Sequence, residues 1–200
     1  MANTISPYAE AAKSVTIVVM GVSGSGKTTV GKRLAEALGA EFIEGDDLHT
    51  DEARAKMASG RPLDDDDRWP WLDRVGAELA DATRSPAGVV VACSALKRAY
   101  RDRIRAAAPA VHFVFLDGSQ RTIDARMATR SGHYMPTSLL ASQLATLERP
   151  DRDERDVVTL SLERPAAEVV GDAVRALTAS ATDDVGRARA SARSRRASRR

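Results

Sequence analysis

Two kinds of hydrophobic pattern alternate along this chain. Five short runs are mostly apolar and rich in β-branched residues, which indicates strands buried within a sheet. These runs occupy residues 15–20, 41–44, 88–93, 111–118 and 157–162. Between them, apolar residues recur every three or four positions, the spacing of one helix face. The predicted helices span residues 27–38, 46–59, 67–83, 95–107, 119–130, 138–148 and 165–179.

Strands that alternate with helices from end to end predict an α/β fold with a parallel sheet and right-handed crossovers. We expect three layers, α/β/α, around five strands. A chain of 200 residues suits one domain. The expected division is an N-terminal extension at 1–14, a domain at 15–180 and a tail at 181–200.

The composition separates the body of the chain from its tail. The net charge is +2, but residues 183–200 hold seven arginines and two aspartates, so the other 182 residues sum to about −3. An Arg-, Ser- and Ala-rich segment without apolar periodicity is expected to be disordered. It either binds an anionic partner such as nucleic acid or is a solvated extension, and we favour the extension.

The remaining composition points to the cytoplasm. No apolar run approaches the ~20 residues that cross a bilayer, so no membrane association is expected. The first residues lack the basic and apolar regions of a secretion signal. Cys93 is the single cysteine, so an intrachain disulfide is excluded, which is typical of a reducing compartment. Cys93 ends an apolar run and is expected to be a small core residue.

One glycine-rich stretch carries a strong motif. GVSGSGKT matches GxxxxGK[ST] in full and lies between a predicted strand and a predicted helix. Its backbone N–H groups would cradle phosphates, Lys27 would reach the β- and γ-phosphates, and Thr28 would offer its hydroxyl to Mg²⁺. The predicted nucleotide contacts are Gly21, Val22, Ser23, Gly24, Ser25, Gly26, Lys27, Thr28 and Thr29.

The motif predicts a nucleoside triphosphate donor but leaves the acceptor open. No NKxD-like motif of a GTPase follows a strand, and a large AAA-type ATPase needs a longer chain. A small phosphotransferase using ATP and Mg²⁺ is the remaining class. Phosphoryl transfer needs a carboxylate near the acceptor hydroxyl. Asp46 and Asp47 follow the second strand, where α/β sheets bind ligands. Either could instead cap the next helix.

Basic residues follow the third and fourth strands. Ser94, Lys97 and Arg98 lie at a predicted helix start, where cations suit an anionic acceptor, although a solvated helix face is the alternative. For Arg101, Arg103 and Arg105 we predict that solvated face.

Arg126 and Arg130 are four residues apart and share one helix face before a Gly-His break. They would neutralise a phosphoryl group if this segment closes as a lid. Taken alone, a solvent-facing arginine pair and an ordinary loop histidine at His133 would be the simpler interpretations.

The segment RPLDDDDRWPWL, residues 61–72, holds four consecutive aspartates. Consecutive carboxylates on a loop cannot all face one ion, so a metal site is disfavoured. We expect Asp66 or Asp67 to cap a helix that begins near Arg68. Trp69 and Trp71 would anchor that helix to the core.

Four stretches, in this order and spacing, resemble the gluconokinase family of small P-loop carbohydrate kinases. They are MGVSGSGKTT, EGDDLHTDEARAKMASGRPLDDDDRWPWL, CSALKRAYRDRIR and RSGHYMPTSLLASQLATLERP, within residues 15–175. The resemblance implies ATP-dependent phosphorylation of D-gluconate at its 6-hydroxyl, on an adenylate-kinase-like fold. It implies an acceptor segment around 46–75 and a lid around 126–137. A related kinase of another polyol acid, such as shikimate, is the nearest alternative, and a nucleotide-binding protein with a nucleic-acid-docking tail is another.

The resemblance also implies residue roles. Asp46 would be the base, and Lys27 and the lid arginines, Arg126 and Arg130, would act on the phosphates. The implied gluconate contacts are Asp46, His49, Arg68, Lys97, Arg98 and His133. Members are often homodimers. The family commonly has DGD where this chain has EGD at 44–46, which leaves the role of Glu44 open.

Overall fold

The computed structural model describes residues 15–82, 87–128 and 137–179. Five parallel strands form its sheet, in the order β2-β3-β1-β4-β5. The strands are β1 (Thr16–Met20), β2 (Glu41–Glu44), β3 (Val89–Ala92), β4 (His112–Asp117) and β5 (Val157–Ser161). The α/β prediction is confirmed, and each predicted strand lies within one residue of its observed bounds.

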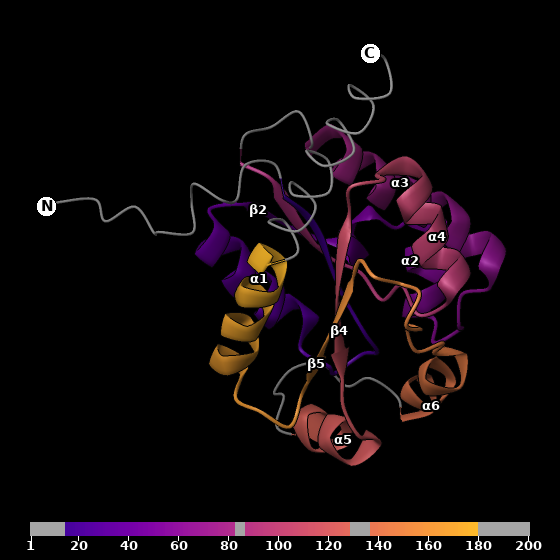
Figure 1. The fold of residues 1–200 in the computed structure, drawn as a ribbon. Coiled ribbons are helices and arrows are strands. Elements are labelled where there is room, and N and C mark those ends of the chain that lie inside the picture. The colour runs from indigo at the N-terminus through magenta and orange to yellow at the C-terminus, as the bar shows by residue number, and fades with distance from the viewer. Residues whose placement is uncertain (1–14, 83–86, 129–136, 180–200) are drawn as a thin grey trace, which may run out of the picture.

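Helices cover both faces of this sheet. They are α1 (Lys27–Leu38), η1 (Gly45–Leu48), α2 (Asp51–Ala58), α3 (Asp65–Ala82), α4 (Arg98–Ala107), α5 (Gln120–Ala128) and α6 (Thr137–Thr146), and residues 166–179 are also helical. Figure 1 shows α1 and the last helix on one side of the sheet, with α3 and α4 on the other. Helices α5 and α6 lie beyond the carboxyl end of β4 (Figure 1). This end of the sheet is therefore where the loops after the strands gather.

The core has two halves because successive side chains of a strand point to opposite faces. Ile17 and Val19 of β1 pack in the half that contains α1 and the last helix. Val18 and Met20 pack in the other half, against α3 and α4. All four side chains are buried, which explains why β1 is apolar after Thr16. Cys93 is fully buried, and burial raises the pKa of its thiol to about 12, as expected of a core cysteine.

The aspartate run starts α3 earlier than predicted. The Asp64 side chain accepts from the N–H of Asp67 at 3.0 Å, and the Asp67 side chain accepts from the N–H of Asp64 at 2.9 Å. This reciprocal pair satisfies N–H groups that a helix start leaves without partners. The cap is therefore Asp64, and the predicted cap at Asp66 or Asp67 was wrong. Trp71 is buried, as predicted, and Trp69 packs edge-on against Tyr100.

The predicted helix at 46–59 divides into η1 and α2. Thr50 caps α2, because its hydroxyl accepts from the N–H of Ala53 at 3.1 Å. Neither Asp46 nor Asp47 is the cap of α2, so that alternative is excluded.

Helix α4 departs from the predicted solvated face at two positions, because Arg105 is only 21% exposed and pairs with Glu154 and Asp156, and Arg101 is buried. Arg103 is exposed, whereas the Arg101 side chain is only 1% exposed and pairs with Glu154. The prediction for Arg101 was wrong because its partner lies 53 residues further along the chain. None of the described helices combines the length and apolar content needed to cross a membrane. The predicted extension, tail and part of the lid lie outside the described residues.

Candidate active site

The phosphate loop connects β1 to α1, as the motif predicts. Gly24 and Gly26 have φ values of 79° and 91°, a left-handed conformation that side chains disfavour. A side chain at Gly24 would also meet Met127 of α5, since a Cβ there lies 2.6 Å from Met127 Cγ. The Lys27 ammonium donates to the carbonyl of Val22 at 3.2 Å and so folds back over the loop. The loop is shaped to surround an anion at the start of α1.

Thr28 and Glu44 form a second polar contact beside the loop. The Thr28 hydroxyl donates to Glu44 Oε2 at 2.7 Å. Burial raises the pKa of Glu44, and the Thr28 hydrogen bond only partly opposes that rise. Glu44 therefore reaches the residue predicted to meet Mg²⁺, despite its additional methylene.

A cavity adjoins the phosphate loop at the carboxyl ends of β1, β2 and β3, where ligands of α/β folds bind. Its walls come from the loops after these strands and from α2, α3, α4 and α6. The polar lining residues are Ser23, Lys27, Asp46, His49, Arg61, Arg68, Ser94, Tyr100 and Gln143. Lys27 of the phosphate loop and Asp46 after β2 thus line the same cavity.

Close packing at Gly45 places Asp46 at this cavity. A Cβ at position 45 would lie 2.2 Å from the carbonyl oxygen of Ala92, so only glycine lets η1 approach β3 this closely. The Trp71 indole N–H donates to the Gly45 carbonyl at 2.6 Å and holds it from the other side. Asp46 lines the cavity and Asp47 is not among the lining residues.

His49 lies in the cavity wall, stacked on Trp71 with 4.3 Å between ring centroids. Its side chain is buried, and Nδ1 has no hydrogen-bond partner in the described part of the chain. Burial lowers the pKa of His49, so the ring is neutral at pH 7. A buried polar atom without a partner normally finds one in a ligand or water. Both features suit His49 to a substrate hydroxyl.

Three basic residues were predicted to contact the acceptor, and only one of them lines the cavity. Arg68 lines the cavity and donates to the Tyr100 hydroxyl at 3.2 Å. Lys97 is not among the lining residues, and its ammonium is 2.8 Å from both carboxylate oxygens of Asp65. Arg98 lies further away, in a bidentate pair with Asp153 at 3.0 and 2.8 Å.

Asp65 joins Lys97 to Tyr100, whose hydroxyl donates to Asp65 at 2.5 Å. The structure thus brings Arg68 to the cavity, places Lys97 behind it and leaves Arg98 outside.

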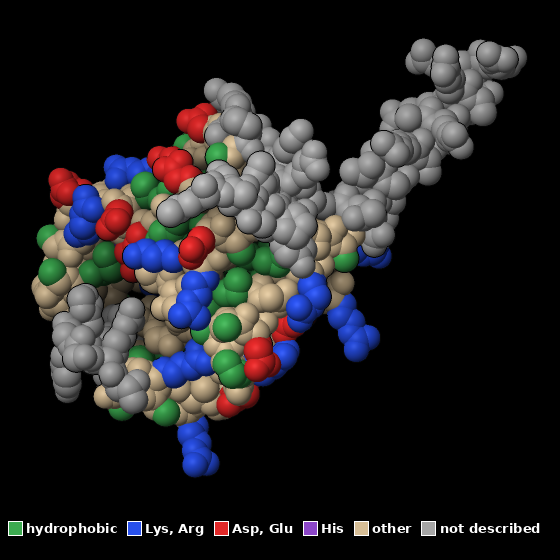
Figure 2. Space-filling view, turned by 90° about the vertical axis from the view of Figure 1, so that its left-hand side faces the viewer, with side chains coloured by type: hydrophobic (Ala, Val, Ile, Leu, Met, Phe, Trp, Pro, Cys, Tyr) green, Lys and Arg blue, Asp and Glu red, His purple; other side chains and the backbone are tan. Residues whose placement is uncertain are grey.

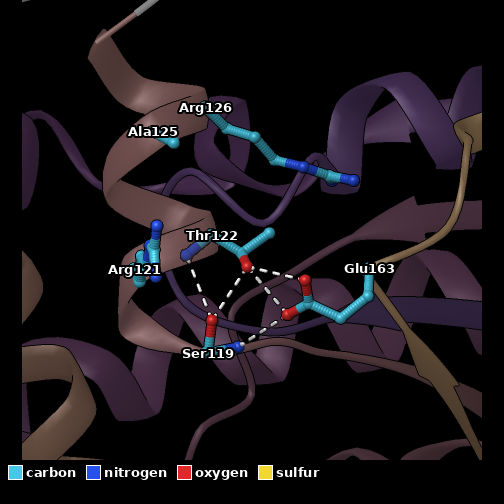
Figure 3. A pocket seen from close by; sticks show the side chains of 6 residues that line it. All are labelled: Ser119, Arg121, Thr122, Ala125, Arg126 and Glu163. Atoms are coloured by element: carbon cyan, nitrogen blue, oxygen red, sulfur yellow. Dashed lines mark hydrogen bonds between the residues drawn. The ribbon is translucent and has the colours of Figure 1, made fainter.

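Arg126 of α5 reaches the phosphate loop. It donates to the carbonyl of Leu162 at 2.6 Å and to that of Ser25 at 3.5 Å. In Figure 3, Ser119, Thr122 and Glu163 are joined by hydrogen bonds, and the Arg126 guanidinium extends beyond them in a second, shallow pocket. Arg126 thus adjoins the loop, while Arg130 and His133 lie outside the described residues.

Three polar residues of the cavity were not predicted from the sequence: Arg61, Tyr100 and Gln143. Tyr100 is a buried residue of α4 with its hydroxyl on Arg68. Gln143 of α6 accepts from the backbone N–H of Ser23 at 2.6 Å. The stretch SLLASQ contains Gln143, but helix periodicity alone assigns it no partner.

A phosphate loop that borders a polar cavity defines the chain as a P-loop NTPase with room for an acceptor beside the nucleotide. A family model for an AAA domain matches residues 16–150.

Similar proteins narrow this class. The thermosensitive gluconokinase of Escherichia coli (strain K12) is 46% identical over 165 residues, covering 82% of this chain and 88% of that protein. A gluconokinase of Gluconobacter oxydans (strain 621H) is 46% identical over 159 residues, covering 80% and 89%. The crystal structure of a gluconokinase from Sinorhizobium meliloti 1021 superposes with a TM-score of 0.79 at 51% identity, covering 86% and 97%. This chain belongs to the gluconokinase family.

Proposed function

We propose that this protein is an ATP-dependent gluconokinase. It transfers the γ-phosphoryl group of ATP to the 6-hydroxyl of D-gluconate, giving 6-phospho-D-gluconate and ADP. The observation that carries the proposal is the shared cavity, in which Lys27 of the phosphate loop and Asp46 after β2 both line the wall. The gluconokinases of E. coli and G. oxydans, each 46% identical, support gluconate as the acceptor.

The donor side binds and orients the triphosphate. Loop N–H groups and Lys27 would hold the phosphates. Arg126, which already contacts the loop carbonyl of Ser25, would add positive charge beside them. Electrostatic positioning of this kind supplies most of the catalysis in phosphoryl transfer.

The Thr28 hydroxyl and the Glu44 carboxylate fit a Mg²⁺ ion bound with ATP. Both are the oxygen ligands that Mg²⁺ prefers, and they lie 2.7 Å apart beside the loop. No group of three or more His, Cys, Asp or Glu side chains suited to a metal occurs among the described residues. That suits an ion held mainly by phosphates and water with few protein ligands. When bound, the ion would neutralise charge on the β- and γ-phosphates.

The acceptor side binds gluconate and activates its hydroxyl. Asp46 would accept the proton of the 6-hydroxyl as that oxygen attacks phosphorus. Arg68 would bind the gluconate carboxylate, because its side chain is cationic and lines the cavity. The Tyr100 hydroxyl accepts a hydrogen bond from its guanidinium and so orients it. Neutral His49 would bind a hydroxyl group through Nδ1. Lys97 would act through Asp65, which it holds against Tyr100.

Four further predictions belong to this proposal. Arg130 and His133 would act from a lid around 126–137, on the phosphates and on gluconate respectively. We do not propose a gluconate contact for Arg98, because its guanidinium is bound by Asp153. A homodimer, testable by light scattering, and a cytoplasmic location, testable by fractionation, also stay predictions.

Coupled ADP release with a panel of acceptors tests the proposal. Gluconate is expected to support the highest kcat/KM, and shikimate and other polyol acids to support little. Lys27→Met should abolish the signal, whereas Lys32→Met, an exposed lysine of the same helix, should keep it. No gluconate turnover together with efficient turnover of another acid would assign the cavity to that acid.

A nucleic-acid function makes a different prediction in the same experiment. It predicts little phosphotransfer, and salt-sensitive binding that is lost when residues 183–200 are removed. On the face shown in Figure 2, basic and acidic side chains are interspersed among apolar ones. Interspersed charge on this face does not form a track for a polyanion. The kinase function is supported by the gluconokinases that are 46% identical to this chain.

A further inference from the structure

Gln143 is the only described residue of α6 that lines the cavity beside the phosphate loop. Its side chain is half-buried, and its Oε1 accepts from the backbone N–H of Ser23 at 2.6 Å. Because Ser23 is itself a lining residue, this contact is made on the side of the loop that faces the acceptor. The transferring phosphoryl group must pass through this region, between Lys27 and Asp46.

The contact with Ser23 also orients the amide. A backbone N–H can only donate, so the atom facing Ser23 must be the carbonyl oxygen of Gln143. The Nε2 group, with two N–H donors, therefore points away from Ser23. It has no hydrogen-bond partner among the residues that the structure describes. A neutral donor pair in the cavity that Lys27 also lines matches the needs of phosphoryl oxygens, which only accept hydrogen bonds.

We propose that Gln143 is a catalytic residue whose Nε2 donates to the transferring phosphoryl group, while Ser23 fixes its Oε1. The hydrogen bond to Ser23 holds the amide in place before substrates bind. Nε2 then meets a γ-phosphoryl oxygen as phosphorus moves from the leaving oxygen of ADP to the acceptor oxygen. This inference rests on the proposed kinase function, and wild-type turnover of gluconate tests that function separately.

Two substitutions distinguish a Gln143 that donates to the phosphoryl group from a Gln143 that only binds the N–H of Ser23. Gln143→Glu keeps an oxygen for the Ser23 N–H and nearly the same shape, but it replaces the donor group with a charged oxygen. Gln143→Met keeps the length and removes both functions. If Gln143 donates to the phosphoryl group, Gln143→Glu should lower kcat by about 10²–10³-fold, the usual range for a lost transition-state donor. Gln143→Met should also lower kcat, and ATP affinity should change little in either variant.

The assay measures kcat and KM for gluconate and ATP, normalised to sites titrated with an ATP analogue. Gln120→Glu is the matched control, because Gln120 is exposed on α5 and absent from the cavity lining. The control should keep kcat within about twofold. A Gln143→Glu variant with near wild-type kcat would overturn the proposal, whether or not Gln143→Met is impaired, because anchoring alone would then explain the contact.

Discussion

Arg101 and Glu154 form a buried ion pair whose removal should be costly. Arg101 donates to both carboxylate oxygens of Glu154, at 2.7 and 2.6 Å, and both side chains are only 1% exposed. Arg105 and the Asp151 N–H add further donors to the same carboxylate, at 2.8 and 3.2 Å. Glu154→Gln would turn one oxygen into an N–H₂ group that faces donors. Breaking a buried pair in this way destabilises proteins by about 3–5 kcal/mol.

The Arg101–Glu154 pair also holds a backbone segment that lines the cavity. Arg101 donates to the carbonyls of Ala95 and Leu96, at 3.4 and 3.3 Å. Ala95 has a φ of 41°, a left-handed conformation that costs an alanine on the order of 1 kcal/mol. Its neighbours Ser94 and Leu96 line the cavity. We therefore expect Glu154→Gln to raise the KM for gluconate more than the KM for ATP.

The loss of stability caused by Glu154→Gln should depend on pH. Burial alone would raise the pKa of Glu154, but hydrogen bonds from Arg101 and Arg105 outweigh burial and lower it to about 2. The folded-state pKa is thus below the ordinary glutamate pKa of 4.5. The carboxylate contributes its full stability above the unfolded pKa and loses it as the pH falls toward 2. The free-energy difference between wild type and Glu154→Gln should shrink by about 1 kcal/mol between pH 7 and pH 3.5.

Urea unfolding at the two pH values measures this difference. The matched control is Asp73→Asn, since Asp73 accepts from Arg103 at 2.6 and 2.8 Å in a similar bidentate pair that is about half exposed. Exposed pairs contribute about 0–1 kcal/mol. If Glu154→Gln is no more destabilising than Asp73→Asn at pH 7, the buried pair does not have the role assigned to it.

Three other outcomes are expected. Asp46→Asn should lower kcat by about 10²–10⁴-fold with ATP affinity nearly kept, in steady-state kinetics and calorimetry; a near wild-type rate would remove Asp46 from the mechanism. Gly45→Ala should lower both kcat and thermal stability, because the added methyl group meets the Ala92 carbonyl; unchanged melting and activity would contradict that packing. Cys93 should resist iodoacetamide at pH 8 in the folded protein and react after denaturation, since burial raises its thiol pKa to about 12. Rapid labelling of the folded protein, followed by mass spectrometry, would contradict this.

The sheet and the phosphate loop were predictable because their signals are local. Burial on both faces leaves a strand such as β1 with a continuous apolar run, and the observed β2 has the predicted bounds. The loop needs glycines at left-handed positions between a strand and a helix, and that requirement is written in consecutive residues.

The rest of the site depends on contacts between distant segments. Nothing near Arg101 in the sequence distinguishes it from exposed Arg103, because burial is decided by Glu154. Gln143 meets Ser23 from 120 positions away. The four aspartates of the run have the same chemistry, so only the backbone path could assign the cap to Asp64. Helix periodicity alone could not supply these pairings.

The most direct test of the central claim is the identity of the product. Purified protein is incubated with ATP, Mg²⁺ and ¹³C-labelled D-gluconate, and ³¹P–¹³C coupling identifies the carbon that carries the new phosphate. We predict coupling to C6, with one ADP formed for each phosphate transferred and no product from Lys27→Met. ADP without a phosphorylated gluconate, or a phosphate on another carbon, would contradict the assignment.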